Sequence, residues 1–344
     1  MTAVQWQTLL ATLRGDAVRP LPVGFIIDSP WLPHWCGRSI RDYFTSDEVW
    51  LAANIKAVRE FPDVMFLPGF WSEYGMCTEP SAFGVRCTFP PDEFPHVHTA
   101  LRSADDIAAL PVPDPRADGL LPFVLNRLKL ARPAIEEAGH AVRFAVARGP
   151  LNVACHLMGT TEFLTLMMEE PVRAEALLDK VTTFLRDWID VQREAFATID
   201  GILLLDDIIG FLGEAQFRQF ALPRFSTLFA RDVAVRFLHN DAPCRVSAPY
   251  LAGMGVNLFN MGFDIPLSEL RTLAGPGVTL MGNLPPRDVL ARCSPPEVTS
   301  SARAMAGALA PAARVIFSCG GGMPPDVTGE NIRAFAEGVR GAAG

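Results

Sequence analysis

The chain has 344 residues, of which 49% are hydrophobic and 20% are charged, and its formal net charge is -8. This composition is typical of a globular protein with a large core and excludes a disordered chain, and the length allows one large barrel domain or two smaller domains. The charges are interspersed without a basic cluster that could neutralise phosphates, so we expect no nucleic-acid partner.

The start of the chain, residues 1–20, lacks the basic residues and the continuous apolar stretch of a secretion signal. It predicts a short amphipathic helix and a cytoplasmic protein. The longest uncharged stretch, 246–263, is about long enough to cross a membrane, but its proline, asparagines and glycines indicate a helix, a turn and a strand. We therefore expect no membrane partner. The seven cysteines are odd in number and irregularly spaced, which does not suggest a disulfide framework. We therefore expect the cysteines to be reduced and most of them to be packing residues.

Short apolar runs that end in a polar residue or a glycine recur along the chain. They do not alternate, which is typical of strands buried on both faces of a parallel sheet. The predicted strands are 23–28, 63–70, 142–149, 201–207, 234–241, 255–262, 277–283 and 314–321. Between them, apolar residues recur at spacings of three and four, as in amphipathic helices. The predicted helices are 46–60, 121–139, 161–198, 214–231, 264–274, 295–310 and 329–341.

Eight such units predict an α/β protein that forms one eight-stranded β/α barrel over residues 1–344. The alternative is a doubly wound open sheet, which needs a glycine-rich nucleotide turn after the first strand. The sequence IIDSPW at 26–31 contains no glycine. The third interval is irregular, and its aromatic and proline-rich segment 70–120 predicts an insertion or a lid near the barrel mouth.

Polar residues at the carboxyl ends of barrel strands face the mouth, where substrates bind. Such residues can instead cap the following helix, and the sequence leaves both roles open. The strand-end candidates are Asp28, Arg148, Asp206, Asp207, His239, Asp241, Asn260, Asn283 and Cys319. The adjacent acids Asp206 and Asp207 are candidate catalytic acids or bases, and alternation along the strand predicts that only one of them faces the mouth.

The segment 70–120 adds further candidates. The predicted substrate contacts are Trp71, Glu73, Arg148, Asn260 and Asn283. A pocket could also be lined by titratable residues of this segment, although a solvated loop is the favoured interpretation for all of them: Glu73, Glu79, His96 and His98. The glycine run 320–322 could bind an anion through backbone amides or simply form a tight turn.

His239 and Cys319 end the fifth and eighth predicted strands, which a barrel brings to one rim. Imidazole and thiolate are good zinc ligands, and a third ligand could be Asp241 or Cys244. Three protein ligands would leave one position open for a substrate thiol, whose pKa the metal would lower. Spacing alone favours the alternative that His239 and Cys319 only fill the barrel mouth, because the pattern is not a compact metal motif.

From Arg148 to its end, the chain resembles the uroporphyrinogen decarboxylase superfamily, which includes cobalamin-linked methyltransferases. The matching stretches are GPLNVACHLMGTTEFLTLMMEEP, LLLDDIIGFLGEAQFRQFALPRF, FLHNDAP, VTLMGNLPPRDVL and CGGGMPPDVTGENIRAF. True decarboxylases carry an arginine-rich segment resembling RQAGRY that holds substrate carboxylates. The stretch IIDSPWLPHWCGRSIRDYF lacks it, so the resemblance favours the methyltransferase branch.

The resemblance to the zinc methyltransferases implies His239 and Cys319 as zinc ligands, with Cys319 standing where decarboxylases have histidine. Asp241 occupies the place of a cysteine in that branch. A carboxylate oxygen can also bind zinc, so either Asp241 or Cys244 completes the site, or no metal binds.

The leading expectation is therefore a zinc-dependent methyltransferase that moves a methyl group between a small methylated donor or thiol and a corrinoid or tetrahydrofolate carrier. His239, Asp241 and Cys319 would hold the zinc. Asp206 or Asp207 would orient the substrate or move a proton. The carrier could be bound to a separate corrinoid protein that docks at the mouth. Two alternatives stay open: a decarboxylase or other lyase that acts on a small acid or tetrapyrrole, and a metal-free ligand-binding barrel.

Overall fold

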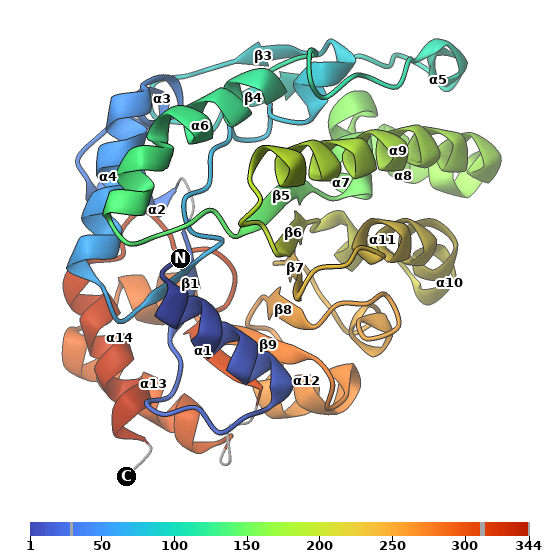
Figure 1. Ribbon diagram of the computed structural model, residues 1–344. Coiled ribbons are helices and arrows are strands. Elements are labelled where there is room, and N and C mark those ends of the chain that lie inside the picture. Colours follow the sequence, from blue (N-terminus) through green and yellow to red (C-terminus); the bar gives the residue numbers. More distant parts are fainter. Residues whose placement is uncertain (28–29, 310–313, 343–344) are drawn as a thin grey trace.

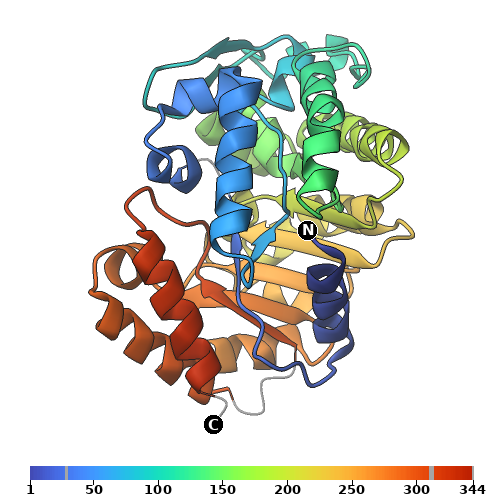
Figure 2. The same cartoon turned by 60° about the vertical axis from the view of Figure 1, so that its left-hand side comes forward.

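The computed structural model describes residues 1–27, 30–309 and 314–342. Parallel strands follow one another in chain order with helices outside them (Figures 1 and 2). The strands are β1 (Gly24–Ile26), β2 (Met65–Leu67), β5 (Phe144–Arg148), β6 (Gly201–Leu205), β7 (Val235–Asn240), β8 (Leu258–Met261), β9 (Thr279–Leu284) and β10 (Val315–Cys319). Seven of these strands lie within a predicted range, and β9 extends one residue beyond its range 277–283, which confirms the α/β fold class.

The strands are ordered as in a β/α barrel. A six-stranded parallel sheet has the order β10-β9-β8-β7-β6-β5, and β1 pairs with β2. Isolated bridges from Val23 to Phe317 and from Ile26 to Gly322 attach β1 to β10. Within the described ranges no strand ladder joins β2 to β5, and near this seam Thr2 forms an isolated bridge with His140.

The helices connect the strands and cover the outside of the sheet (Figures 1 and 2). They are α1 (Ala3–Arg14), α2 (Trp31–Trp35), α3 (Ile40–Thr45), α4 (Asp47–Glu60), α5 (Asp106–Ala109), α6 (Leu121–Glu137), α7 (Pro150–Met158), α8 (Thr160–Glu169), α9 (Pro171–Ala195), α10 (Glu214–Gln216), α11 (Leu222–Phe229), α12 (Leu267–Ala274), α13 (Pro295–Gly307) and α14 (Gly329–Gly341). Shorter helical turns are η1 (Pro80–Phe83), η2 (Ile208–Phe211), η3 (Phe217–Ala221), η4 (Ala248–Tyr250) and η5 (Pro286–Ala291).

All of the predicted helical segments contain helix. The segment 161–198 is divided into α8 and α9, because Pro171 begins a new helix directly after Glu170. The helix α7, which the sequence analysis missed, also begins with a proline, Pro150, directly after β5. No helix in the described part of the chain is both long and apolar enough to span a membrane.

Two apolar clusters form the core. The inner cluster fills the barrel and comprises Met1, Trp6, Leu9, Leu13, Ile26, Met65, Leu67, Trp71, Phe144, Leu203, Val235, Phe237, Leu258, Met281 and Ile316. The outer cluster packs the other face of the strands against the helices. Because α1 contributes Trp6, Leu9 and Leu13 to the inner cluster, this helix closes one end of the barrel (Figure 1). The alternation of inner and outer residues along each strand decides which side chains face the mouth.

The segment 70–120 contains η1, α5 and a small antiparallel hairpin of β3 (Arg86–Thr88) and β4 (His96–His98). The hairpin lies at the top of the molecule in Figure 1. Its register pairs Cys87 with Val97, and the rings of Phe44 and Phe94 pack at 6.5 Å, which connects the segment to α3. The function of this segment as a lid stays a prediction.

Candidate active site

Three of the predicted strand-end residues lie in one layer inside the barrel. The strand register pairs Arg148 with Leu205, Leu205 with His239, and His239 with Asn260. Side chains along a strand alternate between its two faces. Each of these residues lies an even number of positions from an inward residue of its own strand, such as Phe237 of β7, so its side chain also faces the interior. Arg148, His239 and Asn260 are all buried. The structure therefore brings these polar groups together directly above the apolar inner cluster.

His239 is held in one orientation by Asn260. Its Nδ1 lies 2.7 Å from Asn260 Oδ1, while Asn260 Nδ2 donates to the Met281 carbonyl oxygen at 2.7 Å. Because the amide nitrogen is used by Met281, the amide oxygen accepts from His239 Nδ1, and a neutral ring keeps its lone pair on Nε2. Burial opposes a charge on His239, but Asp241, Asp207 and Asn260 outweigh it and raise the pKa of the imidazole.

Asp241 lies next to this lone pair and connects two strand ends. Its Oδ2 is 3.6 Å from His239 Nε2, and its backbone N–H donates to Asp207 Oδ1 at 2.6 Å. The carboxylate also accepts a backbone hydrogen bond from Gly322, which follows β10. A Cβ at Gly321, where φ is +71°, would lie 2.0 Å from Asp241 Oδ1, so this position needs glycine. Burial and then Asp207 raise the pKa of Asp241, against the opposing effect of His239.

Asp206 has a different environment from its neighbour Asp207. It is fully buried, and its Oδ2 accepts the backbone N–H groups of Leu151 at 3.0 Å and Asn152 at 3.1 Å at the start of α7. Its Oδ1 accepts from Ile208 N at 3.1 Å. Burial, as the largest cause, raises the pKa of Asp206 to about 7. Of the two acids, Asp207 is therefore the one that adjoins His239 and Asp241, whereas Asp206 anchors α7.

Arg148 is enclosed by two carboxylates from the segment 70–120. Its Nη2 donates to Glu73 Oε2 at 2.8 Å and its Nη1 to Glu79 Oε2 at 3.1 Å, and all three side chains are buried. Met76 Sδ lies 3.3 Å from Arg148 Nε. The favoured interpretation of Glu73 and Glu79 as residues of a solvated loop was wrong. Their burial depends on an arginine far away in the sequence, so no local signal could have revealed it.

The other predicted contacts have separate surroundings. Trp71 belongs to the inner cluster, and its carbonyl oxygen accepts from the Trp50 indole at 3.0 Å. Asn283 Nδ2 donates to the Ile265 carbonyl oxygen at 2.7 Å, and its side chain lines a hollow of about 280 Å³ next to α12 and α13. Asp28 lies outside the described residues. The histidines of β4 are at the surface, with the His96 side chain 53% exposed.

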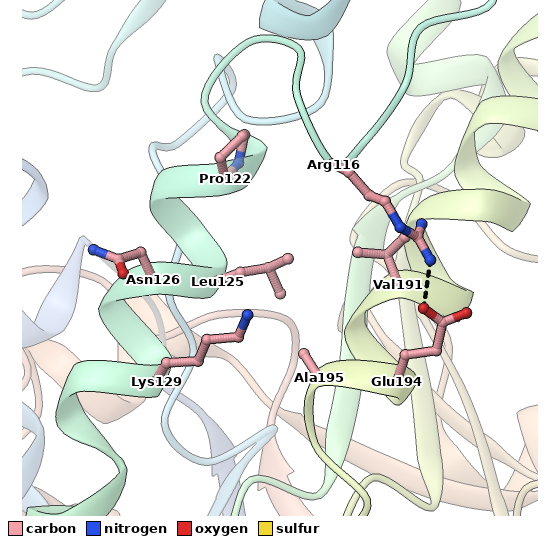
Figure 3. Close-up of a pocket in the computed structure, with 8 residues that line it drawn as sticks. All are labelled: Arg116, Pro122, Leu125, Asn126, Lys129, Val191, Glu194 and Ala195. Carbon is pink, nitrogen blue, oxygen red and sulfur yellow. Dashed lines mark hydrogen bonds and ion pairs between the residues drawn. The ribbon is translucent and has the colours of Figure 1, made fainter.

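A cavity of about 490 Å³ opens next to the end of β7 and β10. Asp241 lines it, together with the aromatic rings of Phe94 and Phe263 and the charged side chains of Arg287 and Asp288. Phe94 comes from the segment 70–120, which therefore contributes one wall. The size suits a small organic molecule. A second hollow, of about 430 Å³, lies between α6 and α9, where the Arg116–Glu194 ion pair and Lys129 face its opening (Figure 3). None of its lining residues belongs to the predicted site.

The family model of uroporphyrinogen decarboxylase (URO-D) matches residues 5–342. The chain belongs to this family. It is 25% identical over 339 residues to the uroporphyrinogen decarboxylase of Coxiella burnetii (strain Dugway 5J108-111), with 90% of each chain covered. It is also 25% identical over 260 residues to the same-named protein of Anaeromyxobacter sp. (strain Fw109-5), with 73% of this chain and 72% of the relative covered.

Two solved structures share the fold of this family member. A methyltransferase from Methanosarcina mazei superposes with a TM-score of 0.83 at 19% identity, over 99% of both chains. A B12-independent methionine synthase from Shewanella sp. W3-18-1 gives a TM-score of 0.57 at 11% identity, over 94% of this chain and 96% of the other. At these identities the likeness establishes the fold of the URO-D family member.

The three predicted zinc ligands are not assembled in this URO-D family member. His239 Nε2 and Asp241 Oδ2, at 3.6 Å, are close enough to share an ion bound at about 2.0–2.2 Å from each. Cys319 belongs to the outer cluster, and its Sγ lies 3.5 Å from the Gly321 carbonyl oxygen. Cys244 is also in the outer cluster, where burial raises the pKa of its thiol to about 12. Among the residues that the structure describes, no group of three His, Cys, Asp or Glu side chains could hold a metal ion.

Proposed function

We propose that this URO-D family member is a methyltransferase that moves a methyl group between a small methylated donor or thiol and a corrinoid or tetrahydrofolate carrier. The observation that carries the proposal is the pairing of Arg148 with Glu73 and Glu79. This buried cation is already neutralised, so it is not free to hold the carboxylates of an acidic substrate. The likeness in fold to a methyltransferase from Methanosarcina mazei supports the same choice.

The charges at the mouth support a donor or acceptor that is not a polycarboxylate. Among the residues that the structure describes, Asp241, Asp288 and one cation, Arg287, are the charged residues that line the cavity, and Asp207 adjoins Asp241. In this described lining, carboxylates therefore outnumber cations. A substrate with several negative charges would be repelled, whereas a neutral or cationic one would not. The aromatic rings of Phe94 and Phe263 offer the apolar contact that a methylated group needs.

In the proposed reaction His239 handles the proton of a thiol. Asn260 keeps the ring proton on Nδ1, so Nε2 faces Asp241 and can accept a proton from a bound S–H group. Asp241, at 3.6 Å, then stabilises the imidazolium that forms, and the thiolate is the nucleophile for the methyl group. Asp207 fixes the Asp241 backbone through its hydrogen bond to the Asp241 N–H.

Zinc stays a prediction from the resemblance, because the described residues bring together two of the three predicted ligands and not the third. Zinc content of the purified protein, measured for wild type and for His239→Ala and Cys319→Ala, tests it. One equivalent of zinc that both substitutions abolish would support the predicted site. Substoichiometric zinc in wild type, or full zinc after Cys319→Ala, would contradict it. We likewise propose that the methyl carrier is bound to a separate corrinoid protein, a proposal that none of the contacts described above requires.

A methyl-transfer assay tests the proposed activity. Methylated amines, methyl thioethers and methoxy compounds are supplied as donors, with free cob(I)alamin, tetrahydrofolate or small thiols as acceptors. Methylcobalamin absorbance or the mass of the methylated product reports transfer. We expect turnover with at least one pair, its loss in His239→Gln, and its retention in His34→Gln, an exposed histidine on α2. Release of CO₂ from uroporphyrinogen without any methyl transfer would overturn the proposal in favour of the decarboxylase alternative.

A further inference from the structure

The segment 70–120 contains two cysteines that lie against the same strand and interact with each other. Cys77 is completely buried, and its Sγ lies 3.6 Å from the His96 carbonyl oxygen on β4. Cys87 lies on β3 directly opposite Val97, the residue that follows His96. Both cysteines therefore lie against the same short stretch of β4, and their side chains are close enough to shift each other's pKa. In the structure both are free thiols, and Cys87 is the more accessible one.

We propose that Cys77 and Cys87 are a redox modification site, at which a low-molecular-weight disulfide such as oxidised glutathione converts the two thiols into a reversible intramolecular disulfide. The inference rests on the position of both cysteines against β4, Cys77 through its hydrogen bond to the His96 carbonyl oxygen and Cys87 through its pairing with Val97, and on the partial exposure of Cys87. It does not depend on the proposed methyltransferase activity.

The two cysteines have different parts in this reaction. Cys77 is buried and its S–H donates to the His96 carbonyl oxygen, whereas Cys87 is partly exposed, and the interaction between the two side chains lowers the pKa of the Cys87 thiol and raises that of Cys77. Cys87 is therefore the thiolate that attacks first. Its sulfur bonds to one sulfur of the incoming disulfide, whose S–S bond breaks and releases one thiolate. The products are a mixed disulfide on Cys87 and one free small thiol, which takes up a proton from water.

The second step closes the intramolecular bond. Cys77 gives its proton to water, and its sulfur attacks the Cys87 sulfur of the mixed disulfide. The bond to the small molecule breaks, the Cys77–Cys87 bond forms, and the second small thiolate leaves. The two cysteine sulfurs are oxidised and the two sulfurs of the small disulfide are reduced, so electrons balance. An excess of the reduced small thiol reverses both steps.

The closed loop would act on the candidate active site through Glu79. The segment 77–87 carries Glu79, which binds the Arg148 guanidinium and also accepts the Arg148 backbone N–H at 3.2 Å. Because a disulfide removes conformational freedom from the loop that it closes, oxidation restrains Glu79 against Arg148. Reduction leaves that restraint to the hydrogen bonds of the hairpin and of η1. The redox state of the pair would thus set how firmly this part of the segment 70–120 is fixed over the barrel.

The experiment uses the full-length protein in glutathione buffers of defined reduced-to-oxidised ratio. Free thiols are alkylated, and peptides are analysed by mass spectrometry. We expect a peptide linked through Cys77 and Cys87 to appear as the buffer becomes more oxidising and to disappear on return to reduced glutathione. Because this measurement is made on wild type, it does not depend on any variant folding. The proposal would be overturned if Cys77 and Cys87 were alkylated at every ratio while glutathione adducts accumulated on other cysteines.

Two variants separate the steps. Cys77→Ser should accumulate a stable glutathione adduct on Cys87, since the resolving thiol is missing, while Cys87→Ser should form no adduct on the buried Cys77. The matched control is Cys293→Ser, which changes a partly exposed cysteine far from Cys77 and Cys87 in the sequence. This variant should keep the Cys77–Cys87 bond. Limited proteolysis should cleave within 77–87 several-fold more slowly in the oxidised wild type than in the reduced protein. Equal cleavage rates together with a formed disulfide would refute the restraint on Glu79.

Discussion

Glu79 and Arg148 are joined twice, because the Glu79 carboxylate accepts both the Arg148 guanidinium at 3.1 Å and the Arg148 backbone N–H at 3.2 Å. The second bond links the segment 70–120 to the end of β5 itself. Glu73 completes the charge pairing at 2.8 Å. The segment is therefore attached to the barrel by a buried ionic cluster, and this cluster determines which charges at the mouth remain available to a substrate.

Glu79→Gln should lower the free energy of unfolding by about 2 kcal/mol, because it weakens the buried charge-assisted hydrogen bonds to Arg148 while Glu73 still compensates the guanidinium charge. Urea denaturation with a constant m-value measures the change. The control is Glu93→Gln, whose side chain is 72% exposed and pairs with His96 at the surface. Its effect should stay within about 0.5 kcal/mol. Similar losses in the two variants would contradict the importance of the buried cluster.

The strands and most helices could be predicted from the sequence because a strand covered on both faces reads as a continuous apolar run. The same property hides the direction of individual side chains. Phe317 and Ile316 are equally apolar, yet Phe317 belongs to the outer cluster and Ile316 to the inner one. Cys319 shares the parity of Phe317, and nothing in the sequence of β10 distinguishes the two faces. The prediction that Cys319 faces the mouth together with His239 therefore could not be tested before the fold was known.

Charge pairing between distant segments was also invisible in the sequence. Glu73 and Glu79 look like solvated residues of a polar, aromatic loop, and only the position of Arg148 makes them buried partners. The resemblance to a family did identify His239 and Asp241, which the structure places side by side. Motif matching thus identified residues that neighbour each other on one strand. It missed the residues whose burial depends on contacts with distant segments.

Asp206 should make the stability of the protein depend on pH between about 4 and 7. Burial raises its pKa to about 7 from the value of 3.8 expected in an unfolded chain. The folded state therefore binds the proton more tightly, and the free energy of unfolding contributed by this group falls as the pH rises through that window. Relative to Asp206→Asn, wild type should lose stability from pH 5 to pH 7, as measured by denaturation at each pH. Asp92→Asn, at an exposed position, should leave the profile unchanged. Parallel profiles for wild type and Asp206→Asn would contradict the raised pKa.

Asn260→Leu should impair the proposed methyl transfer by releasing the orientation of His239. The substitution keeps the side-chain volume similar but leaves His239 Nδ1 and the Met281 carbonyl oxygen without their partner. Removal of the partner that orients a metal-binding histidine typically costs about tenfold to a hundredfold in activity, and we expect a loss of the same order here. The ¹⁵N shifts of the His239 ring should also show a changed tautomer distribution, a readout that does not require activity. Asn126→Leu, on the exposed face of α6, should change neither measurement. Unchanged ring shifts in Asn260→Leu would refute the orienting role.

Gly321→Ala should displace Asp241 and destabilise the protein, for two separable reasons. The backbone at Gly321 has a φ of +71°, which costs any other residue about 1 kcal/mol, and the added Cβ would lie 2.0 Å from Asp241 Oδ1. Gly139→Ala isolates the first cost, because Gly139 has a φ of +77° and no atom within 4 Å of the position of a Cβ. We therefore expect Gly321→Ala to lower the free energy of unfolding by clearly more than Gly139→Ala, and to reduce methyl transfer while Gly139→Ala does not. If the two variants lose the same stability and keep the same activity, the contact between Gly321 and Asp241 has no part in holding the carboxylate next to His239.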